Sequence, residues 1–225
     1  MNKHNAFTLA EVLITLGIIG VVAAMTLPTV INNYKKQVAV NKLKKFYSVM
    51  TQAIQTEEAR NDSLEYWMPD CEGQSDCFEK WYNEHLDKHI KSALKRAKST
   101  PRGDYEVEFA DGSGFNAYVS DNSTIYFFYC TEFSYCGPEK FDGTKTFLFS
   151  ICKVNDKFKF VTSTCGFQSK TRDQLMNSCL KGNSDNADIY SQGRRHACTR
   201  LIEYDGWEMK DDYPWFQAKQ PDKDD

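Results

Sequence analysis

The residues of this chain whose types could do chemistry begin with eight cysteines. They fall into neighbouring pairs along the sequence: Cys71/Cys77, Cys130/Cys136, Cys152/Cys165 and Cys179/Cys198. An even number of cysteines without a CxxC motif is typical of an oxidising compartment. We expect disulfides between nearest neighbours, although many other connectivities are possible, and reduced, buried thiols are the alternative.

Two further groups of side chains could bind ions. His85 and His89 are four apart on a predicted helix and could share a metal, but HLDKH lacks a metalloprotease glutamate, so a solvated pair is favoured. Aspartates crowd the C-terminal region, where calcium is possible and turn formation explains them as well. These are Asp185, Asp188, Asp205, Asp211 and Asp212. We therefore expect no metal and no cofactor, with calcium as the open alternative.

Basic and aromatic side chains allow functional and structural interpretations. The basic ones are Lys88, Lys91, Lys95, Arg96, Lys98 and Arg102. They could contact DNA, but a charged helix face is commoner, and a net charge of −3 gives no general attraction to nucleic acid. Trp207, Trp215 and Phe216 are expected to be packing anchors. The sequence has no GxSxG, HExxH or P-loop motif, so we expect no enzyme.

One carboxylate, Glu11, interrupts an apolar run from Phe7 to Leu27. As a helix, this run would be about 32 Å long, close to the hydrocarbon thickness of a bilayer. A carboxylate there costs about 2–3 kcal/mol, which makes Glu11 a candidate functional residue in need of a partner. No small-x-small cleavage site follows, so the segment is expected to remain in the mature protein.

The N-terminal residues carry a resemblance to a known family. Ala6-Phe7-Thr8-Leu9 followed by Glu11 resembles the signal of type IV pilins and type II secretion pseudopilins. The resemblance continues at Gly20, Ala23, Ala24, Leu27 and Pro28. It implies that a prepilin peptidase cleaves between Ala6 and Phe7 and that Phe7 is N-methylated. The sequence departs from the family at Ala6, where most members have glycine, and at Ala10, where a larger aliphatic is common.

The resemblance gives Glu11 a partner. A freed Phe7 amine is a cation, and Glu11 of a neighbouring subunit can neutralise it and fix the axial register between subunits. The alternative is a Glu11 that reaches the headgroups. Glu11, Gly20 and Pro28 are thus the expected assembly residues.

The remaining sequence predicts an α+β fold, with a long N-terminal helical spine on an antiparallel-sheet head, as in pilins. A stripe at helical spacing, from Tyr34 through Phe46 to Ile54, extends the helix to about Arg60, with a kink or local melting at Pro28. The expected divisions are a leader (1–6), a membrane and assembly segment (7–28), an amphipathic segment (29–60), a disulfide-containing head (61–216) and a disordered tail (217–225).

Periodicity and turn signals place the elements of the head. A second helix is expected from Phe78 to Lys98, and a short one from Asp173 to Leu180. Ala197 to Tyr204 is a helix or a strand. Strands are expected at Tyr105–Phe109, Phe115–Val119, Ile125–Tyr129, Thr146–Lys153 and Phe158–Ser163, with hairpin turns at Asp111-Gly112 and Asn155-Asp156-Lys157.

These features predict a pilin or pseudopilin subunit of a type IV pilus or type II secretion filament. Its expected partners are like or related subunits, prepilin peptidase/methyltransferase, an inner-membrane assembly platform and the membrane itself. We expect a single pass through the inner membrane, with a cytoplasmic N-terminus and an extracytoplasmic head. Lysines after the span, Lys35 and Lys36 first, oppose this orientation by the positive-inside rule. The alternative is a membrane-anchored extracytoplasmic binding protein that never polymerises.

Overall fold

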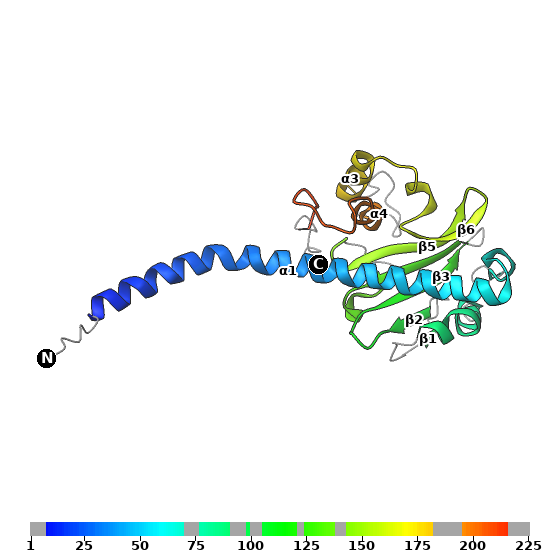
Figure 1. The fold of residues 1–225 in the computed structure, drawn as a ribbon, viewed down its shortest axis with the longest axis horizontal. Coiled ribbons are helices and arrows are strands. Elements are labelled where there is room, and N and C mark those ends of the chain that lie inside the picture. Colours follow the sequence, from blue (N-terminus) through cyan, green and yellow to red (C-terminus); the bar gives the residue numbers. More distant parts are fainter. Residues whose placement is uncertain are drawn as a thin grey trace, which may run out of the picture. The chain divides into compact units, whose positions relative to one another are not determined.

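A computed structural model of the chain describes residues 8–69, 77–90, 98–99, 105–120, 124–137, 143–181 and 195–215. The chain divides into two compact units, residues 1–38 and residues 39–225. The first unit contains only the beginning of helix α1 among its described residues, and the second contains the rest of that helix and the sheet (Figure 1).

Helix α1 runs from Leu9 to Asn61 and confirms the predicted long N-terminal helix. It continues through Pro28, which lacks the N–H that would bond to the preceding turn. Asp62 follows with φ 68°, a left-handed conformation that ends the helix one residue after the predicted end near Arg60.

The second unit is built around a six-stranded antiparallel sheet in the order β1-β2-β3-β4-β5-β6. The strands are β1 (Lys98–Ser99), β2 (Tyr105–Glu108), β3 (Gly114–Ser120), β4 (Thr124–Cys130), β5 (Thr146–Val154) and β6 (Lys157–Thr162). Each strand pairs with the next one along the chain, so the sheet is a meander in which Phe127 of β4 lies opposite Phe149 of β5. Two helices, α3 (Arg172–Lys181) and α4 (Ala197–Tyr204), follow the sheet.

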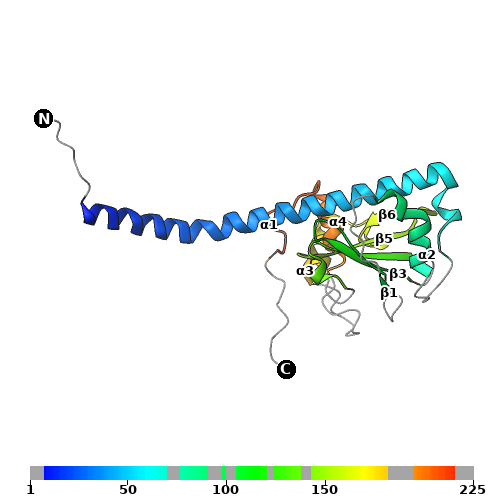
Figure 2. The same ribbon diagram turned by 90° about the horizontal axis from the view of Figure 1, so that it is seen from below.

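The core lies between the later part of α1 and one face of the sheet, as Figure 2 shows. The helix contributes a buried stripe: Ala39, Val40, Leu43, Phe46, Met50, Ala53 and Ile54. Alternate residues of strands β2 to β6 point toward it, as the two-residue period of a strand requires. On the central strands these are Ile125, Phe127 and Tyr129 of β4, and Phe147, Phe149 and Ile151 of β5.

Polar contacts fasten α1 to the loops at the ends of the strands. The ammonium of Lys42 donates to the carbonyls of Asp111 (3.2 Å) and Thr131 (2.8 Å). Lys45 pairs with the Asp111 carboxylate at 3.0 Å. In the β2–β3 turn, Asp111 also accepts a hydrogen bond from the Ser113 N–H, and Gly112 has φ 72°. The lysines of α1 therefore hold a hairpin turn that the sequence predicted.

The other predicted hairpin turn has the backbone that its residues favour. Asn155 and Asp156, between β5 and β6, have φ 52° and 61°, the left-handed pair typical of a tight hairpin. The segment from Ala197 to Tyr204, left open between helix and strand, is a helix. Its end is closed by the N–H groups of Gly206 and Trp207, which donate to the carbonyls of Glu203 and Ile202.

The second predicted helix, Phe78–Lys98, is wrong in form and length. The segment begins with α2 (Cys77–Trp81), continues as the π-helix η2 (Tyr82–Leu86) and ends with the 3₁₀-turn η3 (Asp87–His89). Lys98 belongs to strand β1, and residues 91–97 lie outside the described part. Apolar spacing cannot distinguish these helix types, because it reports which face is buried and not the hydrogen-bond ladder.

Candidate functional site: the N-terminal helix and a buried carboxylate

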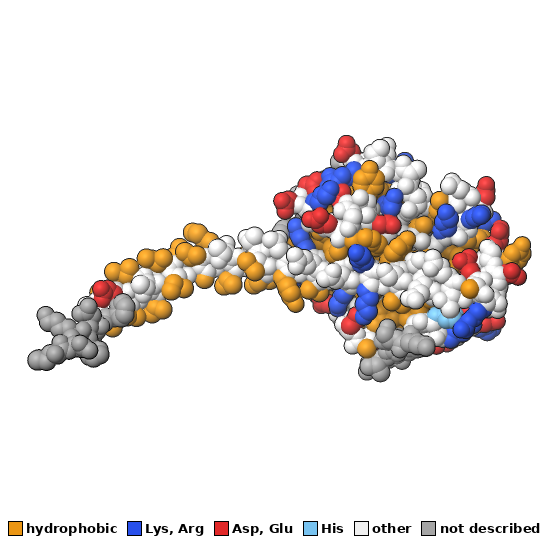
Figure 3. All heavy atoms as spheres, viewed as in Figure 1, with side chains coloured by type: hydrophobic (Ala, Val, Ile, Leu, Met, Phe, Trp, Pro, Cys, Tyr) orange, Lys and Arg blue, Asp and Glu red, His pale blue; other side chains and the backbone are white. Residues whose placement is uncertain are grey.

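In the first unit the apolar side chains of the helix are exposed and do not pack against other described residues. From Leu9 to Ile31 its large apolar side chains are exposed, and Figure 3 shows them along the visible face of the helix. They are Leu9, Val12, Leu13, Ile14, Leu16, Ile18, Ile19, Val21, Val22, Met25, Leu27, Val30 and Ile31. In the described part of the chain, α1 is the one helix that is long and apolar enough to cross a membrane. The segment from Leu9 to Ile31 is about 34 Å long, enough to span the hydrocarbon.

Glu11 belongs to a capping box at the start of this helix. The Thr8 N–H and hydroxyl both donate to Oε2 of Glu11 at 2.8 Å, and the Glu11 N–H donates to the Thr8 hydroxyl at 3.3 Å. The pattern Thr-x-x-Glu satisfies N–H groups that a helix start leaves without partners. The carboxylate therefore has a partner within its own chain, a role that the sequence pattern contained and our sequence analysis missed.

Of the other expected processing and assembly residues, the structure describes Gly20 and Pro28. Ala6 and Phe7 lie outside the described residues. Gly20 lies on the open helix, where an added Cβ would meet nothing within 4 Å, so its backbone is accessible to a neighbouring helix. Pro28 lies inside α1, as described above.

Six of the described cysteines form disulfides between sequence neighbours. Cys130 is bonded to Cys136, Cys152 to Cys165 and Cys179 to Cys198. Cys77 is also disulfide-bonded, and Cys71 lies outside the described residues. The bonded pairs connect β4 to the turn after it, β5 to the loop after β6, and α3 to α4.

The favoured interpretation of His85 and His89 as a solvated pair is wrong. Their side chains are only 13% and 10% exposed, and both contact the Glu57 carboxylate of α1, which is fully buried. Nδ1 of His85 lies 3.0 Å from Oε1, and Nε2 of His89 lies 2.7 Å from Oε2. Glu57 was not among the candidate residues of the sequence analysis. No signal in the helical pattern marks it as buried, because its partners lie some 30 residues further along the chain.

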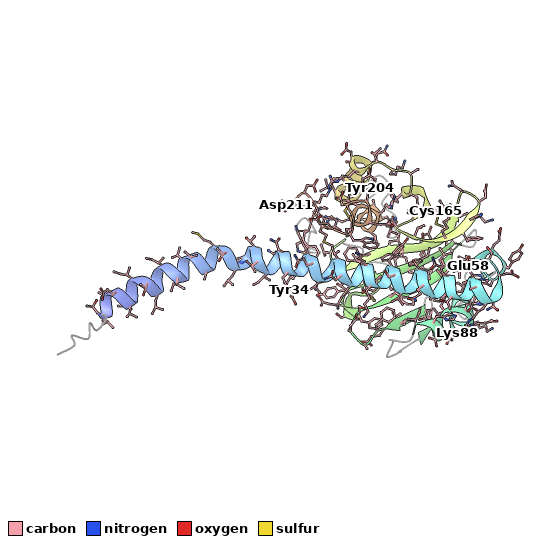
Figure 4. The ribbon with its side chains drawn as sticks, in the orientation of Figure 1. Tyr34, Glu58, Lys88, Cys165, Tyr204 and Asp211 are labelled. Atoms are coloured by element: carbon pink, nitrogen blue, oxygen red, sulfur yellow. A yellow bond between two sulfur atoms is a disulfide. The ribbon has the colours of Figure 1, made fainter. Side chains whose placement is uncertain are left out.

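The predicted aspartate cluster is held by basic side chains. The Arg172 guanidinium makes paired hydrogen bonds to Asp205 and to Asp212, all between 2.7 and 2.9 Å, and Lys210 contacts Asp205 at 3.1 Å. Asp185 and Asp188 lie outside the described residues. Among the described residues, no group of three or more His, Cys, Asp or Glu side chains could hold a metal ion. Asp211 lies at the outer edge of this region (Figure 4).

Two of the three predicted aromatic anchors pack in the head. Trp207 contacts Tyr47 of α1 with ring centroids 5.3 Å apart, and Trp215 packs against the core. Phe216 lies outside the described residues.

Of the six basic residues singled out in the sequence, Lys91, Lys95, Arg96 and Arg102 also lie outside the described residues. The remaining basic residues separate, because Lys88 binds Glu57 and Lys98 is in β1.

Comparison with known families places these features in a class. Residues 1–27 match the family model described as the prokaryotic N-terminal methylation motif, which is the prepilin signal of type IV pilins and pseudopilins. Together with the α+β head, this defines a pilin-like protein. Residues 29–216 match the model described as "Family of unknown function (DUF6613)", and because this match covers most of the chain, the protein belongs to that family. Neither the curated proteins nor the solved structures contain a match.

Proposed function

We propose that this protein is a structural subunit of a type IV pilus or a type II secretion filament and polymerises through its N-terminal helix. The observation that carries the proposal is the exposed apolar helix with one carboxylate, Glu11, in its first turn, directly after a prepilin signal. A surface of this kind needs either lipid or other helices around it. Before assembly lipid surrounds it, and in the filament the helices of neighbouring subunits replace lipid.

Processing comes first in this proposal. Prepilin peptidase cleaves between Ala6 and Phe7, and Phe7 becomes the N-methylated terminus. The new amine belongs to Phe7, which precedes Thr8 directly and lies four residues before Glu11 in the sequence. In the membrane the capping box holds the Glu11 carboxylate, and in the filament the amine of a neighbouring subunit adds a charged partner.

The proposed location is the inner membrane, with the N-terminus in the cytoplasm and the head outside. The disulfides of the head support this orientation, since such bonds persist in oxidising compartments. The lysines after the span favour the opposite orientation. We give more weight to the disulfides and the prepilin signal, because both indicate an extracytoplasmic head. The motif belongs to structural proteins, and we propose no enzymatic activity.

The capping box also favours a second candidate function. Because Thr8 satisfies Glu11 within one chain, the helix start is stable without a neighbouring subunit. A membrane-anchored extracytoplasmic binding protein that never polymerises would therefore need no second subunit to stabilise the start of its anchor helix.

The variant Glu11→Gln discriminates the two candidates in the native host. It keeps the shape and one hydrogen-bond acceptor for Thr8 but loses the charge. We expect normal membrane insertion and loss of incorporation into sheared or cross-linked filaments, whereas Thr15→Val on the same helix should assemble normally. Absence of the wild-type protein from such filaments would favour the second candidate, whereas incorporation of the Glu11→Gln protein at wild-type levels would overturn the assembly role of Glu11. Mass spectrometry of the mature protein tests processing separately, with methylated Phe7 as the expected terminus.

A further inference from the structure

The Glu57 carboxylate is the fully buried charge of the second unit's described residues, and four donors surround it. Besides His85 and His89, the Lys88 ammonium donates to Oε1 at 3.0 Å and the Asn61 amide at 2.5 Å. Asn61 is on the same helix as Glu57, whereas the other three donors come from η2 and η3. Figure 4 shows Lys88 and Glu58, the neighbour of Glu57, at the same end of the head. The carboxylate thus joins the last turns of α1 to the segment 77–90.

The backbone that carries these donors is irregular. His85 lies in a π-helical stretch and His89 in a 3₁₀-turn, so their angular separation differs from that in a regular α-helix. Residues in π-helices are rare and concentrate at functional sites. Two tryptophans lie beside the same cluster, since the His85 ring is 4.8 Å from Trp67 and 6.3 Å from Trp81 between centroids.

The hydrogen bonds require a deprotonated acceptor. A carboxylate only accepts, so a neutral His85 must carry its proton on Nδ1 and a neutral His89 on Nε2. The Lys88 ammonium lies 3.0 Å from Oε1 and balances the negative charge of Glu57. Protonation of Glu57 would turn one oxygen into a donor facing other donors and would remove the charge that Lys88 neutralises. At least one buried donor would then lose its acceptor, which buried groups tolerate poorly.

We propose that Glu57 is an acid-operated latch whose protonation releases the segment 77–90 from α1 while the sheet stays folded. The titratable groups facing Glu57 are His85, Lys88 and His89. Burial raises the pKa of the Glu57 carboxyl, but the hydrogen bonds from His89, Lys88, His85 and Asn61 outweigh burial and lower the pKa from 4.5 to about 2. Because the folded-state pKa is depressed, the latch holds above pH 4.5 and weakens as the pH falls toward 2.

Fluorine NMR of the full-length protein in detergent micelles, labelled with 5-fluorotryptophan, tests this latch. The chain has four tryptophans, so Trp→Phe variants assign each signal. Between pH 4.5 and 2 we expect the signals of Trp67 and Trp81 to shift before those of Trp207 and Trp215. Glu57→Gln should show the released positions already at pH 7, and the exposed control Glu65→Gln should match the wild type. Wild-type positions in Glu57→Gln at pH 7 would overturn the proposal.

Hydrogen exchange at pH 7 separates a latch from a contribution to overall stability. In Glu57→Gln we expect exchange at least tenfold faster in residues 77–90 and unchanged exchange in β4 and β5. An equal rise in the sheet would overturn the local latch. If Glu57→Gln does not fold, His89→Gln, which keeps an N–H donor, is compared with His89→Leu, which has none. Release in both variants, or in neither, contradicts the proposal.

Discussion

Phe46 of α1 stacks on Tyr129 of β4, with ring centroids 4.5 Å apart and ring planes 19° apart. The same Phe46 ring contacts Phe149 of β5 edge-on at 5.1 Å and lies within 6.2 Å of three further rings. One helix residue therefore joins β4 to β5 at the centre of the core. The sequence identified it as part of the buried stripe, but its central place depends on strands far along the chain.

Phe46→Ala should lower the free energy of unfolding of the head by about 3–5 kcal/mol, because it leaves a cavity among rings that cannot collapse onto one another. Urea unfolding followed by circular dichroism measures the effect. Tyr66→Ala is the matched control, since that side chain is 81% exposed and its removal should change stability by less than about 0.5 kcal/mol. Equal losses in the two variants would contradict the central role of Phe46.

Arg172→Met should destabilise the segment after α4 by about 2 kcal/mol at neutral pH, because it leaves the buried Asp205 carboxylate with Lys210 as its one remaining cation among the described residues. Thermal unfolding of the variant and of Arg172→Lys measures this. Arg172→Lys should recover only part of the loss, since an ammonium cannot make the paired hydrogen bonds. Wild-type thermal stability in Arg172→Lys would show that the positive charge stabilises the segment without the paired hydrogen bonds.

The same network predicts a pH dependence. Burial raises the pKa of Asp205, and the hydrogen bonds from Arg172 and Lys210 outweigh it, while Arg172 lowers the pKa of Asp212 directly. Because both folded-state values lie below the usual 3.8, this stabilisation is present above about pH 4 and is lost on further acidification. Arg172→Met should therefore flatten the acid limb of a plot of melting temperature against pH. Millimolar calcium should leave the melting temperature of the wild-type protein unchanged, because Arg172 and Lys210 already neutralise Asp205 and Asp212. A calcium-dependent rise in the melting temperature would contradict this interpretation.

A pair of glycine substitutions separates backbone strain from packing. Gly112 and Gly143 have φ 72° and 68°, but an added Cβ meets nothing at Gly112 and lies 2.7 Å from Cys198 Sγ at Gly143. Gly112→Ala should cost about 1 kcal/mol for the left-handed backbone alone. Gly143→Ala should cost clearly more, because the Cys179–Cys198 bond holds the obstructing sulfur in place. Equal costs, measured by urea unfolding, would contradict this packing argument.

Removing the Cys179–Cys198 disulfide, which closes a loop between α3 and α4, should destabilise the head by about 3 kcal/mol. The double variant Cys179→Ala/Cys198→Ala tests this without leaving a reactive thiol. Non-reducing peptide mapping should recover Cys130–Cys136 and Cys152–Cys165 unchanged in that variant. Different pairs in the mapped protein would contradict the nearest-neighbour arrangement.

Strands β2 to β6 were predictable to within about a residue at their ends, because alternating apolar residues and turn signals are local, whereas β1 was missed, since Lys98 was expected to end a helix. β5, for example, was expected to end at Lys153 and ends at Val154. The Thr8–Glu11 capping box was also readable, as Thr-x-x-Glu before an apolar run. The burial of Glu57 was not, because it depends on donors that the fold brings from η2 and η3.

The core stripe of α1 has a consequence for biosynthesis. The ribosome makes Leu43, Phe46 and Met50 early, but the strand that covers Phe46 with Phe149 emerges about a hundred residues later. Until then, the apolar face of the later part of α1 has no strand to cover it. We therefore expect the nascent chain to be prone to aggregation until β5 has been synthesised, because long-range contacts form late and leave apolar surface exposed.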